Sequence, residues 1–178
     1  MKMFFSGGCK NGKSSLAEDC ARVLAGEGPL YYLATMISTG AEDDARIARH
    51  LKEREGWGFE TIECGKHILN ALEHADANGS LLLDSVTALL ANEMFDPAGF
   101  DPDAAERVAE ELAQFVARTK NVVFVSDYLY SDAQLSDDWT ERYRRGLALV
   151  DRSLAKCCET VLEVSSGTVI CHKGVLPL

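Results

Sequence analysis

The sequence has no excess of positive charge. Its 18 lysines and arginines stand against 28 aspartates and glutamates, which gives a net charge of −10 at pH 7. This balance argues against a nucleic-acid-binding protein, because no overall cationic field attracts the phosphate backbone. A local basic pocket for a single nucleotide stays compatible with it.

Other common signals are also missing. The most apolar internal run, residues 81–95, is broken by Asp84, Asn92 and Glu93 and is too short to span a membrane. The six cysteines show no C-x-x-C spacing, so neither a zinc site nor a redox pair is indicated. The apolar start is too short for a signal peptide, and no repeat or linker divides the chain. We therefore expect one cytoplasmic domain, residues 1–178, with reduced thiols.

Strand-like and helical segments alternate along the chain. Strand-like runs cover residues 2–5, 30–34, 59–63, 80–84, 122–126, 160–164 and 168–172. Helical spacing covers residues 13–24, 41–54, 67–75, 86–94, 102–119 and 140–156, and Asp101 is expected to cap the helix that begins at Pro102. This alternation predicts an α/β fold with a mainly parallel sheet covered on both faces, and the short Ser165-Ser166-Gly167 connection predicts an antiparallel edge hairpin.

A glycine-rich segment lies between the first strand and the first helix. It reads Gly7-Gly8-Cys9-Lys10-Asn11-Gly12-Lys13-Ser14, which fits the pattern G-x-x-x-x-G-K-[ST]. In such a loop the backbone N–H groups point inward at phosphate, the lysine reaches the terminal phosphates and the Ser14 hydroxyl binds Mg²⁺. A plain glycine turn capped by serine would also have to account for the flanking strand and helix. The segment therefore predicts a fold like that of the P-loop NTPases.

A carboxylate ends the apolar run Leu81-Leu82-Leu83-Asp84. An acid at this place beside a phosphate loop orients Mg²⁺ or its water ligands. Strands often end in aspartate, so the alternative is that Asp84 caps the helix that begins near Val86. The phosphate loop favours the metal role.

Basic residues recur every four positions in the second helix. Arg46, His50 and Arg54 share one face, next to an apolar stripe of Ile47 and Leu51. An imidazole between two guanidinium groups holds a proton poorly, so His50 would be neutral and nucleophilic near pH 7. On spacing alone, a solvated helix laced by ion pairs is the favoured interpretation.

With these segments in view, the chain resembles the bifunctional adenosylcobinamide kinase / adenosylcobinamide-phosphate guanylyltransferase family of cobalamin biosynthesis, nearly from end to end. The glycine loop looks like the family's phosphate loop. The other matching segments are Tyr32-Leu33-Ala34-Thr35, Arg46-Ile47-Ala48-Arg49-His50 with Arg54, Thr61-Ile62-Glu63, Leu82-Leu83-Asp84-Ser85-Val86-Thr87 with Asn92, and Arg142-Tyr143-Arg144.

The resemblance implies two reactions. ATP or GTP would phosphorylate adenosylcobinamide, a corrinoid, and GTP would then guanylylate His50, which passes GMP to the cobinamide phosphate. Lys13 would take part in catalysis, and Ser14 and Asp84 would hold Mg²⁺. The further nucleotide contacts it implies are Gly7, Gly8, Cys9, Lys10, Asn11, Gly12, Ser15, Ala34, Thr35, Met36, Leu51, Lys52, Glu53, Arg54 and Glu63. It also implies a homo-oligomer, a trimer. From the charge balance and the short apolar runs we expect no nucleic-acid and no membrane partner.

Two segments depart from the family pattern. Ser126-Asp127-Tyr128-Leu129 stands where Asn-Glu-Val-Gly is usual, and Asp151-Arg152 stands where Asn-Gln is usual. Both are expected on the side that faces the corrinoid or a second subunit. Asp127 is a candidate general base, with a solvated loop acid as the equal alternative. A kinase of single activity on another acceptor and a nucleotide-binding sensor without acceptor chemistry stay as alternatives.

Overall fold

The computed structural model describes residues 1–130 and 136–178, and of Arg46 and Glu53 it describes only the backbone. Seven strands of the described chain form one sheet in the order β3-β2-β4-β7-β1-β8-β9. All neighbours in it are parallel except β8 and β9, which form the expected antiparallel hairpin. These strands are β1 (Lys2–Gly7), β2 (Leu30–Ala34), β3 (Glu60–Glu63), β4 (Ser80–Asp84), β7 (Asn121–Asp127), β8 (Thr160–Ser165) and β9 (Thr168–Lys173).

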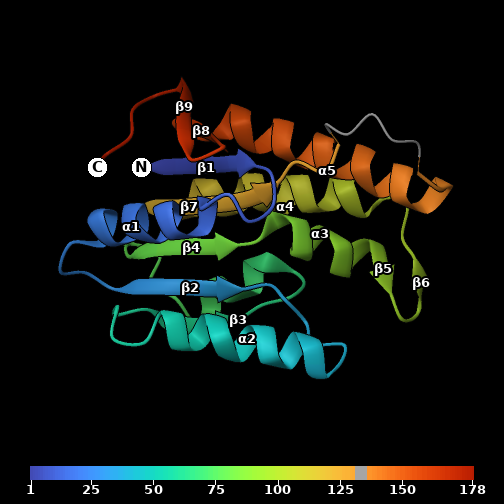
Figure 1. Cartoon of the computed structure of the whole chain (residues 1–178), viewed down its shortest axis with the longest axis horizontal. Helices are drawn as coiled ribbons and strands as arrows, with labels where there is room; N and C mark the ends of the chain where they lie inside the picture. The colour runs from blue at the N-terminus through green and yellow to red at the C-terminus, as the bar shows by residue number, and fades with distance from the viewer. Residues whose placement is uncertain (131–135) are drawn as a thin grey trace.

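Helices cover both faces of this sheet, as the alternation of segments predicts (Figure 1). They are α1 (Lys13–Ala25), α2 (Ala41–Glu53), the 3-10 helix η1 (Ile68–Glu73), α3 (Val86–Met94), α4 (Ala104–Arg118) and α5 (Asp138–Cys157). No helix in the described ranges is long and apolar enough to cross a membrane.

The period of two along each strand divides the core into two layers. On β1, Met3 and Phe5 pack with α1, whereas Phe4 belongs to the layer that also holds residues of η1, α3, α4 and α5. The apolar stripe predicted on α4 is buried, with Leu112 and Phe115 fully enclosed.

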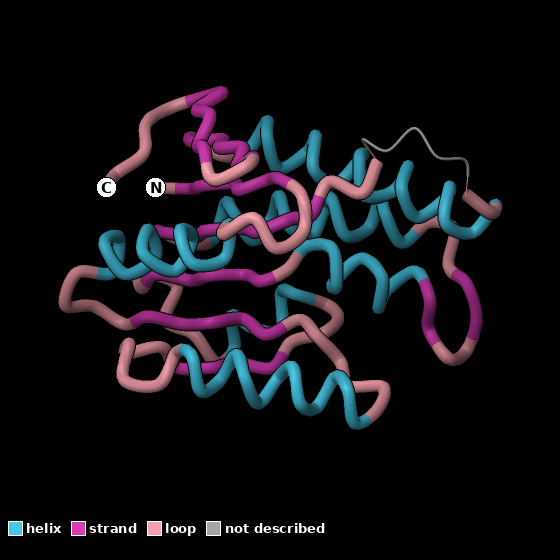
Figure 2. The backbone as a smooth tube through the Cα atoms, viewed as in Figure 1, coloured by secondary structure: helices cyan, strands magenta, loops and turns pink. Residues whose placement is uncertain are grey.

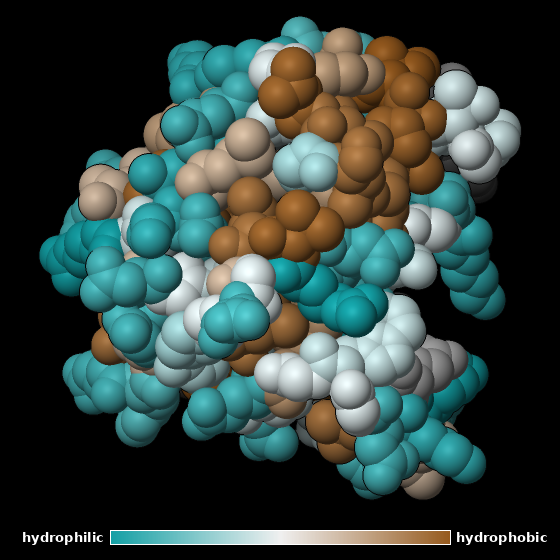
Figure 3. All heavy atoms as spheres, turned by 90° about the vertical axis from the view of Figure 1, so that its left-hand side faces the viewer, coloured by the Kyte–Doolittle hydropathy of each residue, from teal (hydrophilic) through white to brown (hydrophobic). Residues whose placement is uncertain are grey.

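Because the strands run in the same direction, the loops that follow their carboxyl ends lie together at one edge of the sheet (Figure 2). A patch of hydrophobic side chains on the face with the two chain ends lies away from that edge (Figure 3).

Several local predictions are wrong. Within the helix predicted at residues 67–75, only Ile68–Glu73 is helical, and it is the 3-10 helix η1. Its buried Ile68 and Ala71 are three residues apart, the spacing that a 3-10 turn repeats. The helix predicted from Pro102 begins at Ala104. Asp101 still accepts a hydrogen bond from the Asp103 amide at 2.9 Å, as a capping residue does, and its other oxygen pairs with the guanidinium of Arg107 at 2.7 Å.

Two further differences concern short or peripheral segments. The strands β5 (Phe95–Asp96) and β6 (Gly99–Phe100), which form a small antiparallel hairpin after α3, were not predicted. The apolar stripe expected on the buried face of α2 is also wrong, since Leu51 is 46% exposed. This helix lies at the β3 edge (Figure 1), where neither core layer includes it.

A buried carboxyl group on α5 affects the stability of the fold. Asp151 on α5 is 3% exposed and accepts a hydrogen bond from the Tyr130 hydroxyl at 3.0 Å. Burial raises the pKa of this carboxyl to about 7, although the hydroxyls of Ser126 and Tyr130 act in the opposite direction. Between pH 4 and 7 the unfolded chain therefore releases a proton that the folded chain keeps, so this group lowers the stability as the pH rises.

We expect Asp151→Asn to stabilise the fold by about 1–3 kcal/mol at pH 8, with little effect near pH 4. The gain in stability cannot exceed about 4 kcal/mol, which is the free energy that corresponds to raising the pKa of this carboxyl from its ordinary value to about 7. Urea unfolding of both proteins at several pH values measures the difference. A gain that does not grow between pH 4 and 7 would contradict the assignment of this proton to Asp151.

Candidate active site

The glycine loop connects β1 to α1 in a conformation that requires glycine. Gly7 and Gly12 have φ angles of 156° and 90°. A Cβ atom at Gly7 would lie 2.3 Å from the carbonyl oxygen of Val164 on β8, so no larger residue fits there. The side-chain amide of Asn11 donates to the same carbonyl oxygen, which fixes the loop against the neighbouring strand.

Lys13, at the start of α1, points back over this loop. Its side chain is 4% exposed, and Nζ donates to the carbonyl oxygen of Gly8 at 2.7 Å and to Oδ1 of Asp127 at 2.6 Å. Asp127 ends β7, and its backbone N–H donates to the Thr87 hydroxyl of α3 at 2.9 Å. The lysine ammonium is thus held between the phosphate loop and a carboxylate from another strand.

Asp84 ends β4, the strand that lies next to β7 in the sheet. The hydroxyls of Ser14 and Tyr32 bond to its carboxylate. Burial raises the pKa of Asp84, while these two hydroxyls and the nearby charge of His50 lower it. His50 on α2 is therefore within electrostatic reach of the group that also contacts the loop serine.

The alternative capping role of Asp84 is wrong. Helix α3 is capped by Ser85, whose hydroxyl accepts from the Ala88 amide at 3.2 Å. The fully buried Thr35 hydroxyl accepts from the Ser85 amide at 2.7 Å and donates to its carbonyl oxygen at 2.8 Å. This pair of hydrogen bonds ties the carboxyl ends of β2 and β4 together and leaves the carboxylate of Asp84 to face the loop.

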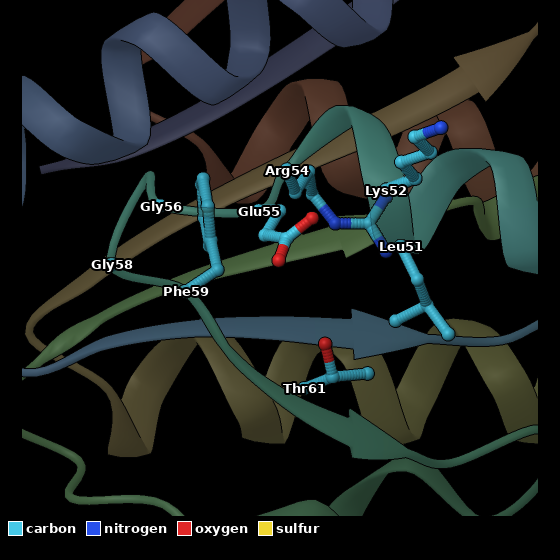
Figure 4. A pocket seen from close by; sticks show the side chains of 8 residues that line it. All are labelled: Leu51, Lys52, Arg54, Glu55, Gly56, Gly58, Phe59 and Thr61. Atoms are coloured by element: carbon cyan, nitrogen blue, oxygen red, sulfur yellow. The ribbon is translucent and has the colours of Figure 1, made fainter.

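A cavity of about 610 Å³ lies between the end of α2 and the start of β3 (Figure 4). Leu51, Lys52 and Arg54 line it, together with the loop that ends at Phe59. The guanidinium carbon of Arg54 lies 3.4 Å from the centre of the Tyr32 ring, and its Nη1 lies 4.0 Å from Glu18 Oε1 of α1.

This cavity includes no residue of the phosphate loop. A continuous path of contacts joins the two, because Arg54 stacks on Tyr32, whose hydroxyl bonds to Asp84, which bonds in turn to Ser14. Polar groups between a nucleoside-sized cavity and a phosphate loop can orient a nucleotide that spans both.

The remaining predicted site residues are spread over the same edge of the sheet. In the strand register Ala34 is paired with both Glu63 and Asp84, so these three positions follow one another across β3, β2 and β4. Thr35 and Met36 follow β2 directly. Cys9 and Lys10 are exposed on the loop, and Ser15 continues α1. The side chains of Arg46 and Glu53 lie outside the described residues, so the expected basic stripe of α2 is seen only at His50 and Arg54.

Sequence spacing gave no indication of three contacts in this region. Tyr32 positions Asp84, Glu18 positions Arg54, and Thr87 positions Asp127. None of these three residues is near its partner in the sequence. The available signal for Tyr32 was its alternation on β2, which places it on the same face of the sheet as α1.

The fold and the glycine loop together define a protein like the P-loop NTPases. Two solved structures share this fold. One is a KaiC-like protein from Pyrococcus horikoshii OT3, with a TM-score of 0.53, and the other is the flagellar accessory protein FlaH from Methanocaldococcus jannaschii, with a TM-score of 0.50. Each match covers 97% of this chain and 78% of the other protein's chain, at 13% sequence identity. A search of curated proteins found no match.

The family is narrower than this fold class. Residues 3–171 match the model of the family described as cobinamide kinase / cobinamide phosphate guanyltransferase. The chain belongs to that family, and the resemblance seen in the sequence is confirmed.

Proposed function

We propose that this protein phosphorylates adenosylcobinamide with ATP or GTP, and then transfers GMP from GTP through His50 to give adenosylcobinamide-GDP. Family membership supports the substrate class and both kinds of transfer. The observation that carries the two-step scheme is the position of Asp84, which lies close both to the phosphate-loop Ser14 and to His50 of α2. One bound triphosphate could thereby be presented to two reacting groups.

The donor set beside the loop fits Mg²⁺. A carboxylate and a hydroxyl are hard oxygen ligands, and Asp84 and Ser14 already lie against each other. These two residues would hold the ion, and the bound ion would neutralise negative charge on the phosphates.

In the first reaction, the chain supplies a cation and a base. The polyphosphate competes with Asp127 for Lys13, because both are anions that bind the same ammonium group. The released carboxylate of Asp127 then accepts the proton of the acceptor hydroxyl, whose oxygen attacks the γ-phosphorus as the bond to the β-phosphate oxygen breaks. Lys13 and the loop N–H groups stabilise the charge that develops.

In the second reaction, a ring nitrogen of His50 attacks the α-phosphorus of GTP. The bond from that phosphorus to the β-phosphate oxygen breaks, and pyrophosphate leaves. A phosphate oxygen of the cobinamide phosphate then attacks the same phosphorus and displaces the imidazole. The covalent intermediate divides one difficult transfer into two easier ones.

Two measurements test the scheme. With ATP and Mg²⁺, the expected result is phosphate transfer that requires adenosylcobinamide. With GTP and Mg²⁺ alone, intact-mass analysis should show an acid-labile GMP adduct. A kinase of single activity on another acceptor and a nucleotide-binding sensor would both give neither result. Phosphate transfer without the adduct would leave only the kinase reaction, and each of these outcomes would contradict the proposal.

We expect Asp127→Asn to lower kcat of the kinase reaction by about 10²-fold, since the amide cannot accept the acceptor's proton. The GMP adduct should still form, because guanylylation of His50 needs no such proton transfer. Kinase assays and intact-mass analysis on the same sample separate the two effects. The exposed Asp103→Asn serves as the matched control, and equal kinase rates for both variants would remove Asp127 from the mechanism.

A further inference from the structure

Three side chains with metal-ligating atoms converge at a place that the mechanism above does not use. His67 precedes η1, Glu93 lies near the end of α3, and Glu111 lies in α4. Nδ1 of the histidine and one carboxylate oxygen of each glutamate lie within 4.8 Å of one another. Nδ1 is 3.7 Å from Oε1 of Glu93 and 3.7 Å from Oε1 of Glu111. The cysteine spacing that argued against a zinc site does not bear on this set, because it contains no cysteine.

The charges around these atoms leave a deficit of positive charge. The side chain of Glu93 is 4% exposed and that of Glu111 is 17% exposed. Arg107 binds Oε2 of Glu93 at 3.1 Å and shares its other nitrogen with Asp101 at 2.7 Å. Three carboxylates therefore share one guanidinium group, and with a neutral imidazole two negative charges stay uncompensated. A divalent cation would offset both.

The point where the three atoms converge is open to solvent. The ring of His67 is 59% exposed, and the partly exposed carboxylate of Glu111 has no hydrogen bond within the described residues. Oε1 of Glu93 accepts from the backbone amide of His67 at 2.7 Å, which positions this oxygen and leaves it a second lone pair. An ion from solution can therefore reach all three atoms without opening the core.

The donor set indicates which class of ion fits. Mg²⁺ and Ca²⁺ prefer oxygen ligands alone, whereas Zn²⁺ binds both imidazole nitrogen and carboxylate oxygen. Ligands about 2.1 Å from a tetrahedral zinc ion lie about 3.4 Å apart, so the two distances of 3.7 Å require little movement. Rotation of the more exposed Glu111 can close the remaining gap between the carboxylates. Arg107 holds the outer oxygen of Glu93, as partners of metal ligands commonly do.

A neighbouring residue of α3 already fastens the same segment of the chain. The side-chain amide of Asn92 donates to the carbonyl oxygen of Gly65 at 2.9 Å and to that of Thr35 at 2.7 Å. An ion held by the next residue, Glu93, and by His67 would add a second connection between α3 and the segment that follows β3. Glu111 would extend this connection to α4.

We propose that His67, Glu93 and Glu111 bind a zinc ion, with water completing its coordination, and that this ion stabilises the fold. The site is separate from the proposed Mg²⁺ ligands Asp84 and Ser14. The inference therefore does not depend on the proposed function.

The test is Zn²⁺ binding to the full chain, purified in the presence of a chelator and titrated by calorimetry. The wild type is expected to bind one zinc ion at this site with a Kd of about 50 µM or tighter. His67→Gln and Glu111→Gln each remove one ligand, and each is expected to raise that Kd about tenfold or more. The exposed His74→Gln and Glu110→Gln are the matched controls and should bind like the wild type.

Urea unfolding gives a second readout with a change of sign. Without metal, Glu111→Gln should be at least as stable as the wild type, because it removes one uncompensated negative charge. With Zn²⁺ at 100 times the wild-type Kd, the wild type should gain about 2.7 kcal/mol, and the variant, with its tenfold weaker binding, about 1.4 kcal/mol or less. An equal gain in both proteins would place the ion elsewhere and overturn the inference.

The inference is also overturned if the wild type binds zinc more weakly than about 50 µM, or if either variant fails to weaken binding by about tenfold. Co²⁺ is an independent probe, because a cobalt–thiolate bond gives a strong charge-transfer band in the near ultraviolet. That band at the first equivalent of Co²⁺ would place the ion on a cysteine and contradict the assignment. The assays of phosphate and GMP transfer are separate from all these measurements, so a failure of the proposed function is distinguishable.

Discussion

Replacement of His50 by glutamine is expected to abolish the GMP adduct, with a fall of about 10⁴-fold or more in guanylyl transfer. Glutamine keeps a polar side chain of similar length but has no nitrogen lone pair that can attack phosphorus. Phosphorylation of adenosylcobinamide with ATP should remain within about threefold of the wild-type rate, because Lys13, Asp84 and Asp127 are unchanged. The variant would thus divide the two activities of the chain.

Intact-mass analysis after incubation with GTP and Mg²⁺ measures the first effect, and a kinase assay on the same preparation measures the second. The exposed His74→Gln provides a matched control at a histidine that follows η1, away from the phosphate loop. An adduct that persists in His50→Gln would place the nucleophile elsewhere. A parallel loss of both activities would instead give His50 a structural role near Asp84.

The alternating pattern of the sequence was sufficient for the fold. The central parallel strands β2, β4 and β7 are nearly continuous apolar runs, as in Leu81-Leu82-Leu83, because helices cover both faces of the sheet. The phosphate loop is equally local, since all its defining residues lie between Gly7 and Ser14. Information of this kind is contained in neighbouring residues and can be read without knowledge of distant contacts.

The interactions that organise the site are not local. Lys13 and Asp127 are separated by 114 positions, and their contact follows only from β7 lying next to β1 in the sheet. The same holds for Asp151 and Tyr130, whose hydrogen bond joins α5 to the segment that follows β7. Sequence spacing indicated that Asp127 follows a strand, but it could not indicate which cation the carboxylate binds.

The start of α4 shows where a local rule holds only in part. Asp101 accepts a hydrogen bond from the Asp103 amide, as a capping residue does, but Pro102 and Asp103 form a turn and the helix begins at Ala104. The pairing of Asp101 with Arg107, six positions away, is not part of the capping pattern that the sequence suggests.

Replacement of Lys13 by methionine is expected to lower both transfer activities by about 10³-fold or more. Methionine retains the length of the buried side chain but cannot stabilise the negative charge that develops on the phosphates. Kinase rate and GMP-adduct formation measure the effect, and Lys120→Met, at an exposed position before β7, is the matched control. Activity like that of the wild type would mean that this loop does not serve phosphate chemistry.

The interpretation must separate chemistry from stability, because Lys13→Met leaves the carboxylate of Asp127 without its partner at 2.6 Å. We expect a loss of about 1–2 kcal/mol in the free energy of unfolding from that change. The double variant Lys13→Met with Asp127→Asn removes both charges and should recover most of the stability. Since it restores neither the cation nor the base, its activity should stay as low as that of the single variant. Recovery of activity together with stability would show that the ion pair only supports the fold.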